Sequence, residues 1–126
     1  MYCTRKLTEQ VWWVGGSDRR LALFENLFPI TRGVSYNSYL ILDEQTAVVD
    51  TVDSSISRQF LENVLHTLDG RPLDYLVINH MEPDHGASVE QILRRYPKVK
   101  VISTEKSFML MRQFGFHPDE HECVEV

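Results

Sequence analysis

Apolar residues recur at helical spacing in three stretches of the chain. In residues 54–68 they form one face of a helix, which the hydroxyl of Ser54 or Ser55 would cap and Asp69-Gly70 would end. The same spacing predicts helices over residues 86–96 and 104–115. The apolar positions of the three helices are Ile56, Phe60, Leu61, Val64, Leu65 and Leu68; Val89, Ile92, Leu93 and Tyr96; and Phe108, Leu110, Met111 and Phe114.

Alternating or continuous apolar runs predict the strands. Residues 34–42 alternate, a polar turn follows at 43–45, and residues 46–50 return, so a hairpin is expected. Short apolar runs predict further strands over residues 11–14, 73–79 and 99–103. Residues 21–28 are compatible with a strand or an irregular segment that ends at Pro29, and residues 117–126 show no strong pattern. One face of the 34–42 strand would carry Val34, Tyr36, Leu40 and Leu42.

The order of these elements predicts the fold class. Strands come first and then alternate with helices, which is typical of an α/β fold. Helical connections between strands imply parallel neighbours and right-handed crossovers. Residues 80–85 would then lie at the carboxyl end of a strand, where open α/β sheets bind their ligands.

Length, charge and cysteine content narrow the class of protein. A chain of 126 residues is long enough for one domain, and its net charge of -5 argues against nucleic-acid binding. No apolar run is long enough to span a membrane, and the N-terminus does not resemble a signal peptide. Cys3 and Cys123 are expected to be unlinked thiols in a cytoplasmic protein, with a disulfide as the less favoured alternative.

Four potential metal ligands, His80, Glu82, Asp84 and His85, fall within six positions. In an extended segment alternate residues point to the same side, so the first three can converge, and a turn would aim His85 at a neighbouring point. Each side chain alone could be solvated, and Asp84 could cap the following helix. However, two carboxylates gathered at a strand end are costly without a cation, so we expect metal binding.

The motif His-x-Glu-x-Asp-His resembles the His-x-His-x-Asp-His signature of the metallo-β-lactamase-like superfamily, with Glu82 in place of the second His. This substitution is characteristic of flavodiiron proteins, also called A-type flavoproteins. Four segments carry the resemblance: residues 35–41, 49–53, 74–80 and 81–86. An added carboxylate also favours iron over zinc, because it is a harder ligand than imidazole.

The resemblance implies a cofactor set and residue roles. His80 and Glu82 would bind one iron of a non-haem diiron centre, and Asp84 and His85 the other. Asp50 corresponds to an acidic residue that supports the site without binding metal, although it could equally be a plain turn residue at a strand end. In the family the centre reduces O2 to water or NO to N2O, with electrons from FMN on a second domain and from a partner such as rubredoxin or a reductase.

The resemblance covers only part of such a protein. Residues 1–126 are expected to form a single partial domain, half of a metallo-β-lactamase-like αββα sandwich, with a mixed sheet and helices packed on one face. Further family ligands and the FMN domain would lie beyond Val126, whereas His66, His117 and His121 are expected to be solvated. His66 falls with Asn63 on the polar face of the helix predicted over residues 54–68. Half a sandwich would expose an apolar sheet face, so a homo-oligomer is expected.

Three functions remain open at this point. The favoured one is a module of a flavodiiron oxidoreductase that is inactive without its missing parts. The second is a zinc-dependent hydrolase of the same superfamily, which Glu82 disfavours. The third is a non-catalytic fragment or assembly module.

Overall fold

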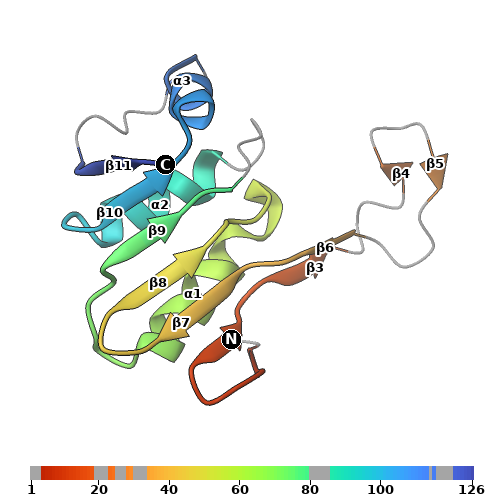
Figure 1. The fold of residues 1–126 in the computed structure, drawn as a ribbon. Helices are drawn as coiled ribbons and strands as arrows, with labels where there is room; N and C mark the ends of the chain where they lie inside the picture. Colours follow the sequence, from red (N-terminus) through yellow and green to blue (C-terminus); the bar gives the residue numbers. More distant parts are fainter. Residues whose placement is uncertain are drawn as a thin grey trace.

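A seven-stranded sheet carries the fold of this computed structural model (Figure 1), which describes residues 4–18, 23–24, 28–29, 34–79, 86–113, 115 and 121–126. The strand order is β1-β2-β7-β8-β9-β10-β11. β1, β2, β7 and β8 pair with one another in antiparallel fashion, and β8, β9, β10 and β11 pair in parallel, so the predicted mixed sheet is confirmed. The strands are β1 Arg5–Lys6, β2 Val11–Trp13, β7 Tyr39–Leu42, β8 Thr46–Val49, β9 Tyr75–Val77, β10 Lys100–Ser103 and β11 Cys123–Glu125.

The prediction of a single strand over residues 34–42 is wrong in one respect, because the structure divides this segment between two sheets. β6 (Val34–Tyr36) pairs with β3 (Gly16–Asp18), whereas β7 forms the predicted hairpin with β8. The break falls at Ser38, whose carbonyl accepts the backbone N–H of Val14 at 2.9 Å. In the ambiguous 21–28 region, β4 (Leu23–Phe24) pairs with β5 (Phe28–Pro29).

The three predicted helices are present as α1 (Ser57–Leu68), α2 (Gly86–Arg95) and α3 (Glu105–Gln113). The predicted serine cap of α1 is wrong: a 3-10 turn, η1 (Ser54–Ile56), precedes the helix, and its N-cap residue Ile56 makes no side-chain cap. The carboxylate of Asp53 instead accepts the N–H of Ser55 at 2.8 Å. No helix in the described part of the chain is long and apolar enough to cross a membrane.

The hydrophobic core lies between one face of the sheet and the helices. Helices α1 and α2 run side by side over this face (Figure 1). One residue from each of β7, β8, β9 and β10 pairs in register with the next, and all four are fully buried: Leu40, Val48, Leu76 and Val101. Phe60, Val64, Ile92 and Val89 cover this row from the helices, as their periodicity predicted.

The burial of Asn63 differs from the prediction for the first helix. The sequence places it on the polar side of α1 with His66, but its side chain is fully buried, whereas His66 is exposed as expected. Its Nδ2 donates to the carbonyl oxygens of Val14 at 2.9 Å and Gly15 at 3.2 Å. The chain bends here from β2 into β3, so these buried carbonyls need a donor that the sheet does not supply.

The C-terminal segment contains a strand that the sequence pattern did not predict. β11 pairs in parallel with β10, although the side chains of Cys123, Val124 and Glu125 are all exposed. Backbone hydrogen bonds therefore form this strand without an apolar alternation that could reveal it. His121, predicted to be solvated, is half-buried with its Nδ1 enclosed; His117 and Cys3 lie outside the described residues.

The opposite face of the sheet is also apolar. Register places Tyr39, Val49, Val77 and Ile102 in one row across four strands, and all four are half-buried. The half-sandwich predicted from the sequence agrees with this arrangement of one covered and one open apolar face.

Candidate metal centre

The four predicted ligands, His80, Glu82, Asp84 and His85, lie outside the described residues. The structure instead describes both ends of the segment that carries them. Asn79 lies two residues after β9, and Gly86 is the first residue of α2. The segment thus connects the carboxyl end of a parallel strand to a helix, as predicted, and its own geometry stays a prediction.

Asp50 lies beside this point, one residue after the end of β8. Its backbone is left-handed, with φ of 64°, a conformation that non-glycine residues seldom adopt. Its N–H still donates to the carbonyl of Val77 at 2.7 Å, as in a parallel ladder. Its own carbonyl accepts the hydroxyl of Ser38 at 2.8 Å. The ladder between β8 and β9 therefore ends at Asp50.

The carboxylate of Asp50 continues the pairing where the ladder stops. In a regular parallel ladder the N–H of Asn79 would donate to the carbonyl of Asp50. Here it donates to Oδ1 of Asp50 at 2.8 Å, and the side-chain Nδ2 of Asn79 donates to Oδ2 at 3.0 Å. Both carboxylate oxygens thus accept bonds from the residue directly before His80. Asp50 thus joins the end of β8 to the end of β9, and its role beside a metal stays a prediction.

A second contact fixes the same strand end from the other side. The buried hydroxyl of Ser103, the last residue of β10, donates to the carbonyl of Ile78 at 2.6 Å. Ser38, Asn79 and Ser103 were not among the predicted site residues. The available signal was weak: Asn79 and Ser103 end predicted strands, Ser38 lies within the strand predicted over residues 34–42, and only Asn79 adjoins the ligand motif in the sequence.

The chemistry of the donor set is compatible with iron. Two imidazoles and two carboxylates within six residues match the ligands of non-haem iron sites. Within residues 4–79 and 86–126, so far as the structure describes them, no three His, Cys, Asp or Glu side chains gather as a second possible site. The four ligands predicted from the sequence therefore stay the candidate metal ligands, and metal binding by them stays a prediction.

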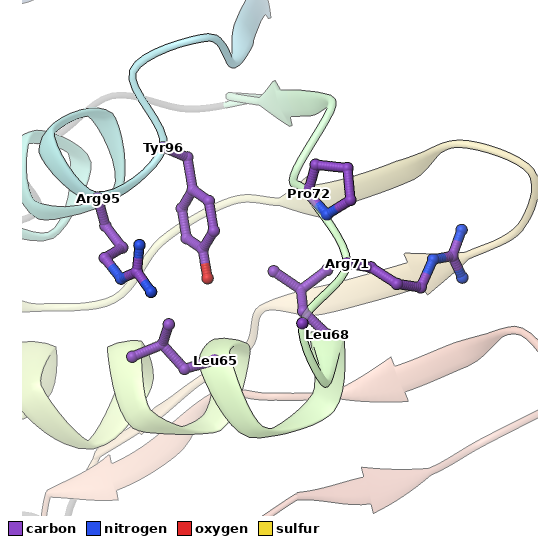
Figure 2. A pocket seen from close by; sticks show the side chains of 7 residues that line it. Leu65, Leu68, Arg71, Pro72, Arg95 and Tyr96 are labelled. Carbon is purple, nitrogen blue, oxygen red and sulfur yellow. The ribbon is translucent and has the colours of Figure 1, made fainter.

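A separate hollow of about 400 Å³ lies near the amino end of β9, whereas the ligand motif follows its carboxyl end (Figure 2). Arg95 and Tyr96 extend into one space above Leu65, and the guanidinium of Arg95 lies 5.4 Å from the Tyr96 ring centre. Burial raises the pKa of the Tyr96 phenol. Arg71 points away from this space and donates to the carbonyls of Asp43 and Glu44. The hollow is thus distinct from the candidate metal centre.

Comparison with known proteins places the chain among β-lactamase-like sequences. A family model described as "ODP family beta lactamase" matches residues 34–126. The anaerobic nitric oxide reductase flavorubredoxin of Aliivibrio fischeri is 36% identical over 117 residues, which cover 92% of this chain and 24% of the relative. The chain thus spans about a quarter of the length of that relative.

Solved structures of similar fold agree. The flavodiiron protein of Giardia intestinalis matches with a TM-score of 0.83 and 27% identity, over 98% of this chain and 30% of that one. The rubredoxin oxygen:oxidoreductase of Desulfovibrio gigas has the same TM-score at 24% identity, over 98% of this chain and 31% of its own. The predicted fold and the predicted resemblance to flavodiiron proteins are both confirmed.

Proposed function

The chain belongs to the ODP beta-lactamase family, and from this membership we propose that it supplies part of the diiron centre of a flavodiiron oxidoreductase. The observation that carries the proposal is the pair of hydrogen bonds from Asn79 to the Asp50 carboxylate. They join the end of β8 to the residue before the ligand motif. A metal site needs such support, because partners behind the ligands fix their orientation.

The proposed roles follow the ligand motif. His80 and Glu82 would hold one iron, and Asp84 and His85 the other, while Asp50 holds the segment in place through Asn79. When bound, the iron pair would supply the redox chemistry that reduces O2 to water or NO to N2O with electrons from FMN. The protein's own part would be to hold these four ligands in fixed positions relative to each other.

The rest of the proposal concerns the surroundings of this centre. Residues 1–126 would form a single partial metallo-β-lactamase-like domain, and the remaining ligands and FMN would come from outside these residues. The chain would act in the cytoplasm in electron transport, with rubredoxin or a reductase as donor, without nucleic acid or membrane partners. The open apolar row of the sheet supports a homo-oligomer.

Glu82 makes the metal preference testable against a matched variant. Zinc binds most protein sites more tightly than ferrous iron. The informative quantity is therefore the ratio of the two affinities, and not which metal binds more tightly. We expect Glu82→His, which restores the hydrolase motif, to lower the iron-to-zinc affinity ratio relative to the unchanged chain. Both affinities would be measured by anaerobic titration, with bound metal counted by mass spectrometry. An unchanged or higher ratio in the variant would contradict the proposed role of Glu82, and a chain without any bound metal would favour an assembly module.

A further inference from the structure

We propose that Ser103 is a positioning residue of the ligand segment, holding its strand from the side opposite Asp50. The inference rests on the proposed function, because a positioning role presupposes that residues 80–85 bind metal. Ser103 is 2% exposed and ends β10, on the far side of β9 from β8. Its hydroxyl lies 2.6 Å from the carbonyl oxygen of Ile78, two residues before His80.

The position of this bond explains why a hydroxyl is needed there. The N–H of Ile78 donates to the carbonyl of Ile102 at 2.9 Å, which continues the regular parallel ladder of β9 and β10. In that ladder the next bond would run from the N–H of Thr104 to the carbonyl of Ile78. The chain instead turns into α3 at Thr104, whose hydroxyl accepts the N–H of Ser107 at 3.1 Å. The Ser103 hydroxyl supplies the donor for Ile78 at the point where the ladder ends.

The two sides of β9 therefore end in the same way. Toward β8, the Asp50 carboxylate replaces a backbone carbonyl as acceptor for Asn79; toward β10, the Ser103 hydroxyl replaces a backbone N–H as donor to Ile78. The N–H and C=O of Ile78 are thus held from the β10 side, and the N–H of Asn79 is held from the β8 side. The strand end is thus held up to Asn79, the residue that precedes the first predicted ligand.

The test compares Ser103→Ala with Thr46→Val. Thr46 is a matched control, because it is 1% exposed and its hydroxyl also donates at 2.6 Å to a backbone carbonyl, that of Pro72. This bond lies at the start of β8, the opposite end of the parallel strands. We expect Ser103→Ala to weaken ferrous iron binding by about tenfold or more. We also expect faster amide hydrogen exchange of the peptide covering residues 78–86 in the metal-free chain. Thr46→Val should change neither, even where it lowers stability as much.

The two readouts separate this inference from the proposed function. A wild-type chain that binds no iron would refute the proposed function, while exchange in the 78–86 peptide would still test the hold of Ser103 on the strand end. Unchanged iron affinity and exchange in Ser103→Ala, or changes equal to those in Thr46→Val, would overturn the positioning role. If Ser103→Ala does not fold, Ser103→Cys keeps a weaker donor of similar shape, and an intermediate effect on both readouts is expected. Wild-type behaviour of Ser103→Cys would then count against the role.

Discussion

Gly15→Ala is expected to lower the free energy of unfolding by about 3 kcal/mol, because the added methyl group has no space. A Cβ at this position would lie 2.0 Å from the carbonyl oxygen of Tyr36, 3.0 Å from its carbonyl carbon and 3.1 Å from the nitrogen of Ser38. All three are backbone atoms at the break between β6 and β7. The clash can be relieved only by moving the strands that lead to Asp50. Urea denaturation would measure the loss.

Gly16→Ala is the matched control one residue further along. Its Cβ would lie 3.0 Å from Cδ1 of Ile56, the far end of a flexible side chain that can move aside. We expect this variant to lose less than about 1 kcal/mol. Equal losses in the two variants would mean that the close approach of Gly15 to Tyr36 does not limit stability.

Asp50→Asn is expected to weaken metal binding by about 10- to 100-fold while the chain stays folded. Asparagine tolerates the left-handed backbone of this position, so strain is not added. Its side chain, however, offers one acceptor oxygen where Asp50 offers two, and its amide would face a donor of Asn79. Residue 50 would then hold the end of β9 less firmly, and we expect the ligand segment that follows to be less well positioned. Anaerobic titration with ferrous iron would measure the effect.

Asp50→Gly distinguishes the supporting role of Asp50 from that of a turn residue. Glycine favours positive φ, so this variant keeps the turn and relieves strain at this position, which offsets part of the stability lost with the hydrogen bonds to Asn79. It removes both acceptors of Asn79, and we expect a loss of metal affinity at least as large as in Asp50→Asn. Wild-type affinity in Asp50→Gly would show that Asp50 only shapes the turn.

Local apolar periodicity predicted the parts of the fold that bury side chains. The helices around Phe60, Ile92 and Phe108 and the hairpin of β7 and β8 follow from it, because each buries one face. β11 could not be predicted in this way, since its side chains are exposed and its pairing is made by the backbone. Asn63 was misplaced because its partners, the carbonyls of Val14 and Gly15, are distant in sequence.

The candidate centre was predictable in its ligands but not in its support. His80 and Glu82 stand in a compact motif, so their chemistry can be read locally. The bonds from Asn79 to Asp50 and from Ser103 to Ile78 join residues 29 and 25 positions apart. Such contacts depend on strand order and on where each ladder ends. Short polar residues at strand ends have too many possible roles for the sequence alone to assign one.

The central claim is that residues 80–85 bind iron, and thermal unfolding with and without anaerobic ferrous iron tests it most directly. A metal that binds only the folded chain must stabilise it, by about 2.7 kcal/mol at a free concentration one hundred times Kd. The comparison is a double variant, His80→Ala with His85→Ala, which removes one imidazole from each proposed iron. We expect iron to raise the Tm of the wild-type chain and to leave that of the double variant unchanged. No rise in the wild-type chain at saturating iron, or an equal rise in both, would contradict the account.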